Sequence, residues 1–234
     1  MKTTRNFILT FIIPLVMVSC GQTETEKPVA ETPSEKVAPI APPIINTPDE
    51  ALAELKNGNQ RFLNAEPINI GYKEQIESTK LGQKPHSLIL SCLDSRVPPE
   101  IIFDQGIGNI FVARVAGNIE DPNIIGSMEF ATKVVETKLI VVMGHNKCGA
   151  VKGAIDNAVL GNLTQLVDQI KPAITGDKNN PDEVLDETAK NNVKMTIADI
   201  LRESSVLKEL ISENKVKIVG AYYDITTGKV TFLD

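Results

Sequence analysis

The feature that most constrains the fold is a series of short, continuous apolar runs separated by longer segments with helical periodicity, such as 124–135 and 184–210. Strands that are buried on both faces produce such runs, because helices cover both sides of a parallel sheet. The sequence therefore predicts an α/β fold with a mostly parallel central sheet flanked by helices. The expected strands are 87–90, 109–113, 139–143 and 216–221, and a last strand at 229–232 is expected to pair back as a hairpin.

The first residues of the chain have the pattern of a targeting signal. Lys2 and Arg5 precede an apolar run at 7–18, which is too short to span a bilayer comfortably and is typical of a secretory signal peptide. The run ends in LVMVSCG (15–21), which resembles a bacterial lipobox with Met17 where Leu is usual. Cys20 falls where the apolar run stops, and a free exposed thiol there would be a liability.

We therefore expect a signal peptide at 1–19 and lipidation of Cys20. The chain would then be exported and lipid-anchored to a bacterial membrane, facing the periplasm or the cell exterior. The alternative is ordinary signal cleavage nearby, which would leave a soluble protein.

The segment 20–47 is rich in Pro, Glu and Thr. Such a composition cannot bury enough apolar surface to order itself, so we predict a disordered tether. The globular domain is expected at 48–234, because Thr47 is a candidate N-cap and Pro48 stands at the first helical position.

Charge and cysteine content exclude some classes of function. The formal net charge is −6 and no run of Lys and Arg is present, which argues against a nucleic-acid partner. The three cysteines, Cys20, Cys92 and Cys148, lie in settings too different to indicate a disulfide framework.

Residues that commonly bind metals follow two of the expected strands. Cys92 comes directly after one apolar run, and His145 and Cys148 follow another. The carboxyl ends of neighbouring parallel strands meet at one edge of a sheet, so these three side chains can converge if the two strands are neighbours. Two thiolates and an imidazole suit zinc and leave a fourth position open, which indicates catalysis. The alternative is two separate buried cysteines and a structural histidine.

Asp94 and Arg96 add a carboxylate and a guanidinium beside Cys92. Arg96 is expected to keep Asp94 ionised and to orient it through paired hydrogen bonds, so that Asp94 can position a reactive water. The alternative is a structural ion pair that closes a loop.

Four motifs along the chain closely resemble the signatures of the β-class carbonic anhydrases: CLDSRVPPE (92–100), FDQG (103–106), FVARVAGN (111–118) and HNKCGA (145–150). The resemblance covers most of the chain from Leu52 to Phe232. It implies the β-carbonic anhydrase fold, one Zn²⁺ per subunit, CO2 and bicarbonate as the substrate pair, and a homodimer or homotetramer.

The resemblance also implies roles for individual residues. Cys92, His145 and Cys148 match the zinc ligands, and Asp94 and Arg96 match the catalytic pair, with Asp94 as a fourth zinc ligand in a possible closed state. The implied substrate-pocket residues are Gln83, often contributed by the partner subunit, Phe111, and Phe130, which stands where many members have Tyr; plain core packing is the alternative for Phe111 and Phe130.

Two other functions remain open at this point. The same zinc site could hydrolyse another small heterocumulene, such as carbonyl sulfide or carbon disulfide. A lipoprotein that binds or senses zinc without turnover is the third reading, and the Asp94–Arg96 pair argues against it because a storage site does not need such a pair. His86, the only other histidine, is expected to be structural.

Overall fold

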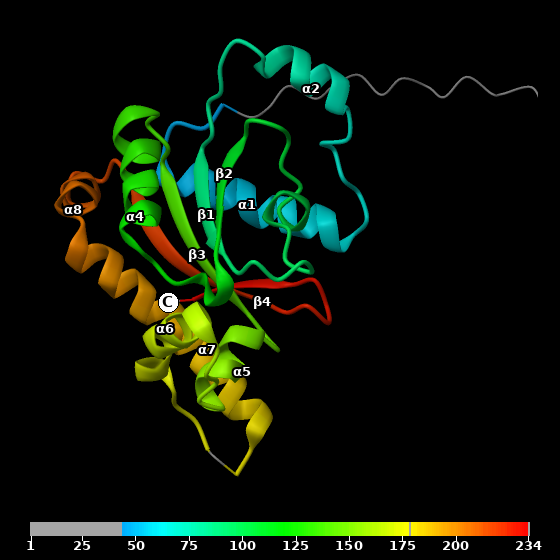
Figure 1. The fold of residues 1–234 in the computed structure, drawn as a ribbon. Coiled ribbons are helices and arrows are strands. Elements are labelled where there is room, and N and C mark those ends of the chain that lie inside the picture. The colour runs from blue at the N-terminus through cyan, green and yellow to red at the C-terminus, as the bar shows by residue number, and fades with distance from the viewer. Residues whose placement is uncertain (1–43, 178, 234) are drawn as a thin grey trace, which may run out of the picture. The chain divides into compact units, whose positions relative to one another are not determined.

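The computed structural model describes residues 44–177 and 179–233. Within that part of the chain, a central sheet has the strand order β2-β1-β3-β4-β5. The first four strands are parallel, and β5 pairs antiparallel with β4, as the hairpin prediction required (Figure 1). The bounds are β1 Ser87–Ser91, β2 Ile110–Arg114, β3 Leu139–His145, β4 Lys217–Tyr223 and β5 Val230–Leu233. The predicted α/β fold is therefore confirmed.

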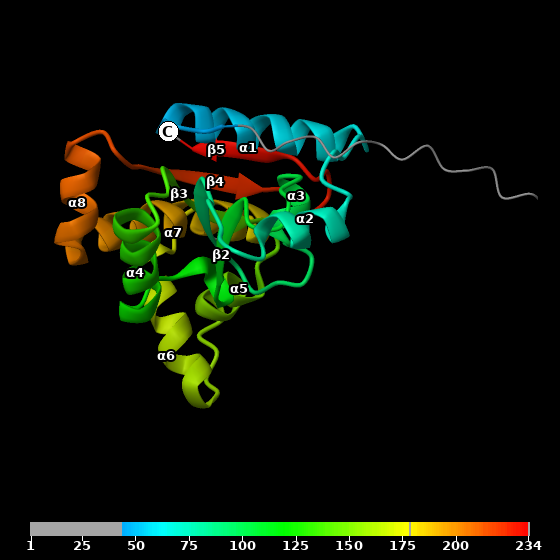
Figure 2. The ribbon, with the colours of Figure 1, turned by 90° about the horizontal axis from the view of Figure 1, so that it is seen from above.

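Helices cover both faces of this sheet, which explains why its central strands are continuous apolar runs (Figures 1 and 2). On one face, α1 (Pro48–Leu63) and α3 (Pro99–Ile102) pack with Leu55 and Phe103 against Ile89 and Val141. On the other face lie α4 (Pro122–Glu129), α7 (Pro181–Glu203) and α8 (Ser205–Ser212). Every residue of β1 and of β3 is buried.

The remaining helices lie at the two ends of the strands. The third apolar cluster of the core includes residues of α5 (Gly149–Ile155) and α6 (Gly161–Ile170), beyond the carboxyl ends, and the two residues that flank a 3-10 turn at Ala116–Asn118. A second such turn, Lys171–Ala173, follows α6. At the opposite end, α2 (Tyr72–Thr79) precedes β1 (Figure 1).

The start of α1 follows from local chemistry. Thr47 Oγ1 accepts a hydrogen bond from the Glu50 N–H, and the Glu50 carboxylate accepts one from the Thr47 N–H, which completes a capping box ahead of Pro48. The predicted helix start is confirmed. Ile45, just before the cap, is partly buried against the first core cluster.

Two expected long helical segments are each divided in the structure. The segment 124–135 becomes α4 and a π-helical turn at Phe130–Val134. The segment 184–210 is broken at Ser204, whose hydroxyl accepts from the Leu207 N–H as an N-cap and donates to Glu129. Glu129, the last residue of α4, gives the Ser204 hydroxyl a polar partner and so stabilises the break. The spacing of apolar residues in the sequence does not reveal this contact.

The signal peptide, Cys20 and most of the expected tether fall outside the described residues. Among the helices of 44–177 and 179–233, none has both the length and the apolar character needed to cross a membrane.

Candidate active site

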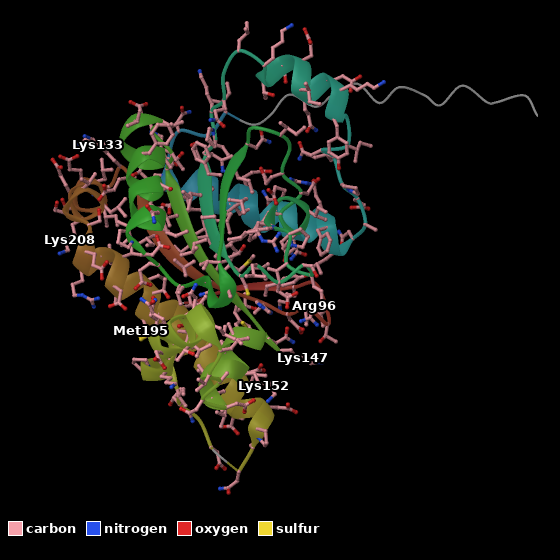
Figure 3. All side chains as sticks on the ribbon, in the orientation of Figure 1. Arg96, Lys133, Lys147, Lys152, Met195 and Lys208 are labelled. Atoms are coloured by element: carbon pink, nitrogen blue, oxygen red, sulfur yellow. The ribbon has the colours of Figure 1, made fainter. Side chains whose placement is uncertain are left out.

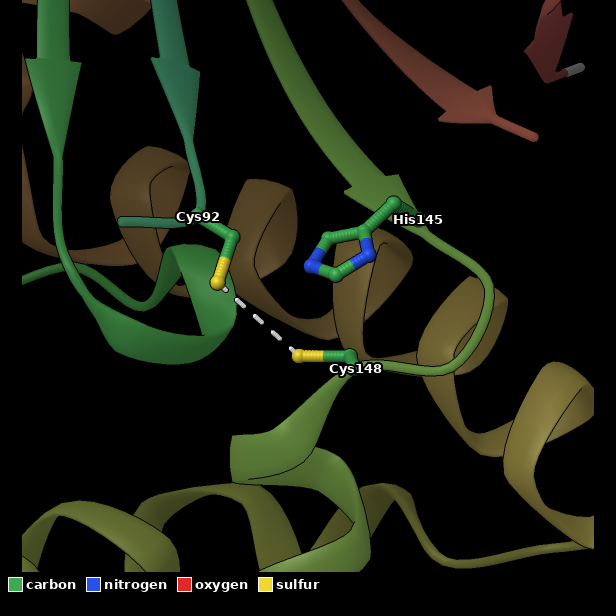
Figure 4. Close-up of side chains that lie close together, drawn as sticks. All are labelled: Cys92, His145 and Cys148. Atoms are coloured by element: carbon green, nitrogen blue, oxygen red, sulfur yellow. Dashed lines mark hydrogen bonds between the residues drawn. The ribbon is translucent and has the colours of Figure 1, made fainter. Parts of the chain in front are cut away.

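The candidate site lies where β1 and β3 end side by side. Cys92 follows β1, His145 is the last residue of β3, and Cys148 is the N-cap residue of α5. Each contributes one ligand atom, these atoms lie within 4.8 Å of one another, and all three residues are buried (Figure 4). The convergence expected from the strand ends is therefore present.

The spacing of the two sulfurs fits a tetrahedral ion. Cys92 Sγ and Cys148 Sγ are 3.9 Å apart. Two sulfurs that each lie about 2.3 Å from a tetrahedral zinc ion are about 3.8 Å apart. The group can thus accept zinc with little movement.

The imidazole of His145 is oriented for metal binding. Its Nδ1 lies 2.8 Å from the carbonyl oxygen of Asn146, and because a carbonyl only accepts, Nδ1 carries the proton. Nε2 is then an acceptor, and it is buried without a hydrogen-bond partner. A lone pair aimed at the two sulfurs from such a position is what a metal ligand requires.

Asn146 is itself fixed by the turn between β4 and β5. Its Nδ2 donates to Asp224 Oδ1 at 2.8 Å, and its Oδ1 accepts from the Ile225 N–H at 2.8 Å. The hairpin therefore orients His145 through one intervening residue.

The pKa values of the two thiols are shifted in opposite directions. The hydrogen bond from Cys148 lowers the pKa of Cys92 to about 4, with further help from the Gly117 N–H. The same hydrogen bond, together with burial, raises the pKa of Cys148. The N–H groups of Val151 and Ala150 at the start of α5 act in the opposite direction on Cys148. A divalent cation would remove the remaining proton, because metal ligation requires both thiolates.

Asp94 and Arg96 form a bidentate pair at the rim of the site. Arg96 Nε donates to Asp94 Oδ1 at 2.9 Å and Arg96 Nη2 donates to Oδ2 at 2.7 Å. The guanidinium lowers the pKa of Asp94 to about 2, so the carboxylate is ionised at neutral pH. Figure 3 places Arg96 at the same end of the molecule as Lys147 of the His145–Cys148 loop.

Arg114 and Gly117 contact the site, although sequence reasoning assigned them no role. Arg114 pairs in register with Ser91, and it donates to the Cys92 carbonyl at 3.1 Å and to the Asp94 carbonyl at 2.5 Å. The Gly117 N–H donates to Cys92 Sγ at 3.4 Å. Both belong to the FVARVAGN motif, which was the available signal.

The implied substrate-pocket residues are not brought to the three ligands within one chain. Gln83 is exposed in the segment that enters β1, at the sheet end opposite the ligands (Figure 1). Phe111 is the second residue of β2, and its ring lies 6.5 Å from that of Phe130, which is 51% exposed. Their roles in substrate binding remain predictions.

The other histidine lies away from the ligand group. His86 is buried, with Nε2 3.0 Å from Gln105 Oε1 and Nδ1 2.8 Å from Ser87 Oγ. Both ring nitrogens are thus satisfied by protein groups, as a structural role requires.

Fold and site together define a class: α/β proteins that present a two-cysteine, one-histidine group at the carboxyl edge of a parallel sheet. The sequence profile of the carbonic anhydrase family matches residues 87–230. The chain belongs to the carbonic anhydrase family and is an enzyme with the β-class fold.

Individual relatives agree with this assignment. Carbonic anhydrase 2 of Mycobacterium tuberculosis is 36% identical over 193 residues, which cover 80% of this chain and 93% of that protein. The β-carbonic anhydrase CafA of Aspergillus fumigatus has a TM-score of 0.62 at 26% identity, covering 80% of this chain and 90% of that one. A tetrameric β-carbonic anhydrase of Sordaria macrospora has a TM-score of 0.61 at 26% identity, covering 79% and 92%.

Proposed function

We propose that the chain catalyses the zinc-dependent, reversible hydration of CO2 to bicarbonate and a proton. The observation that carries the proposal is the buried group of Cys92, His145 and Cys148, whose ligand atoms lie within 4.8 Å of one another and in which His145 Nε2 has no hydrogen-bond partner. The ionised Asp94 beside this group supports a catalytic role over a storage role.

Each residue has a distinct task in this proposal. Cys92, His145 and Cys148 would hold one zinc ion, which when bound acts as a Lewis acid and makes water reactive near neutral pH. Asp94 accepts a hydrogen bond from the attacking water and turns an oxygen lone pair toward the carbon of CO2. Arg96 keeps Asp94 ionised and fixes the plane of its carboxylate.

The substrate pocket is proposed to be completed by a second copy of the chain. Gln83 lies at the wrong end of its own sheet to reach its own ligand group, and relatives include tetrameric enzymes. A homodimer or homotetramer would allow Gln83 of one copy to approach the site of another. Light scattering that finds an active monomer would refute this arrangement.

The decisive experiment measures CO2 hydration by stopped flow in the full chain. We expect activity that is abolished by a zinc chelator, restored by added Zn²⁺, and lost in Cys92→Ser because one thiolate ligand is missing. The matched control is Ser91→Ala, which alters the neighbouring residue but no ligand. Equal low rates in all samples would leave the proposed activity untenable.

We also propose that Cys20 is lipidated and that the enzyme is anchored to a bacterial membrane, facing the periplasm or the cell exterior. The support is the apolar run at 7–18 that ends at the lipobox-like sequence. Mass spectrometry of the membrane fraction should find acyl groups on Cys20, and Cys20→Ala should move the protein to the soluble fraction. An unmodified Cys20 in a membrane-bound chain would contradict the anchor.

A further inference from the structure

Gly117 is placed against Cys92 by an unusual backbone. Gly117 has φ +73° and the next residue, Asn118, has φ +45°, so two consecutive residues are left-handed. A Cβ on Gly117 would lie 2.5 Å from Ile170 Cδ1, so no larger residue fits there without movement. This turn directs the Gly117 N–H to Cys92 Sγ. Such a conformation persists only where the surrounding structure holds it.

Asn192 of α7 contacts the same turn from the other side. Its Nδ2 donates to the Gly117 carbonyl oxygen at 2.8 Å, in a fully buried setting. The amide orientation is determined by chemistry, because a carbonyl oxygen needs a donor and Asn192 Oδ1 is not one. Gly117 is therefore hydrogen-bonded to α7 through its carbonyl oxygen and to the candidate zinc ligand Cys92 through its N–H.

The position of α7 is also tightly set against the second ligand strand. A Cβ on Gly144, the residue before His145, would lie 2.8 Å from Val193 Cγ2 and 3.3 Å from the Ala189 carbonyl oxygen. The helix thus packs directly on β3 next to His145 and cannot shift without disturbing it. The hydrogen bond from Asn192 therefore holds the Gly117 peptide, whose N–H donates to Cys92, in a fixed position relative to α7.

Two further polar atoms belong to the residues where α7 meets the Gly117 turn. Asn192 Oδ1 and Asn118 Nδ2 are both buried without a hydrogen-bond partner, and they belong to residues on either side of the Gly117 carbonyl. Burial of an unpaired amide group costs about 1–3 kcal/mol. The Asn192 amide therefore leaves Oδ1 unpaired while its Nδ2 satisfies the Gly117 carbonyl oxygen.

We propose that Asn192 is a positioning residue for the metal site: it fixes the Gly117 peptide so that its N–H donates to Cys92 Sγ and withdraws charge from that sulfur. The inference rests on the proposed zinc function, since the sulfur matters as a metal ligand. A hydrogen bond to a ligand atom changes the charge that the ligand gives to the metal, and such outer partners affect both metal affinity and reactivity.

The test compares Asn192→Leu with Asn191→Leu in the full chain. Asn191 is the matched control, because its Nδ2 also donates from α7 to a backbone carbonyl, that of Ala173 at 2.9 Å, and not to Gly117, whose N–H donates to Cys92. A merely structural role predicts similar effects of both substitutions. The probes are Co²⁺ substituted at the site, competition with a chelator, and the pH midpoint of CO2 hydration.

For Asn192→Leu we expect the thiolate-to-Co²⁺ charge-transfer band to move to lower energy, because the sulfur becomes richer in electrons. We also expect roughly 10-fold weaker metal binding, because Cys92 is less firmly oriented, and a pH midpoint raised by about 0.5 unit, because the more electron-rich sulfur makes the metal a weaker Lewis acid. Asn191→Leu should match the wild type in all three readouts.

The possible results are distinguishable. Should Asn192→Leu fail to fold, Asn192→Ala provides the same readouts, because it also removes the donor to the Gly117 carbonyl oxygen. An unchanged band and pH midpoint in the folded Asn192 variant would overturn the inference while leaving the proposed function intact. Absence of the charge-transfer band in the wild type would overturn both.

Discussion

Two of the Asp–Arg pairs in the described part of the chain, Asp94–Arg96 and Asp104–Arg61, have the same residue types but different settings. The Asp94 carboxylate receives all three of its hydrogen bonds from Arg96, two positions along the chain. Asp104 instead receives bonds from Arg61 Nε at 2.5 Å, the Ile68 N–H at 3.1 Å and the Asn69 N–H at 3.3 Å. The Arg96 side chain is 55% exposed, whereas that of Arg61 is 19% exposed.

The comparison separates the proposed catalytic carboxylate from a structural one. Asp104 joins α1, the segment after it and the end of α3, so its loss would loosen three parts of the fold. Asp94 is held by its own loop at the rim of the ligand group, so its loss would leave the fold in place and remove a polar group from the site. The geometry of the two Asp–Arg pairs does not reveal this difference. The difference is that the donors to Asp94 come from its own loop, whereas the donors to Asp104 come from distant parts of the chain.

The largest expected effect tests the functional side of the comparison. Asp94→Asn should lower kcat for CO2 hydration roughly 10³-fold, because the amide cannot accept the proton or hydrogen bond as a carboxylate does. Chemical denaturation should give a free energy of unfolding lower than that of the wild type only by the small contribution of the Asp94–Arg96 pair. Retained activity would show that Asp94 only closes the loop.

The structural side is tested by Asp104→Ala. We expect the free energy of unfolding to fall by about 3 kcal/mol, because Arg61 loses one of its two carboxylate partners and two backbone N–H groups lose their acceptor. Urea denaturation measures this change. Stopped-flow activity per folded molecule should stay at the wild-type level, and a selective loss of activity would break the distinction between the two pairs.

The smallest expected effect tests whether Arg96 orients Asp94 and keeps it ionised. Arg96→Lys should lower activity about 10-fold, because an ammonium group cannot form the two parallel hydrogen bonds of the guanidinium. The pKa of Asp94, lowered to about 2 in the wild type, should rise toward its ordinary value of about 4. Carbon NMR of the Asp94 carboxyl group follows this shift.

The same pair contributes an acid-dependent part of stability. Because the folded-state pKa of Asp94 lies below the unfolded value, the pair stabilises the fold above about pH 4, and this contribution is lost as the pH falls toward 2. Unfolding curves of Arg96→Lys should therefore depend less on pH in that window. An identical pH dependence in both proteins would argue against the proposed electrostatic coupling.

Much of the fold was predictable because its signals are local. Apolar runs located the strands within a few residues, and Thr47 and Pro48 located the start of α1. The Asp94–Arg96 pair was predictable for the same reason, since its partners lie in one loop. The break at Ser204 was missed because it depends on Glu129, 75 positions away.

By itself, the sequence determined the parallel α/β architecture, the three candidate ligands at two strand ends and the carboxylate beside them, because periodicity and short motifs encode these features. Only the tertiary structure decided that β1 and β3 are neighbours, that the β4–β5 turn orients His145 through Asn146, and that α7 reaches Gly117 through Asn192. These contacts join residues far apart in the chain. Their partners are selected by the packing of whole elements, which no local pattern records.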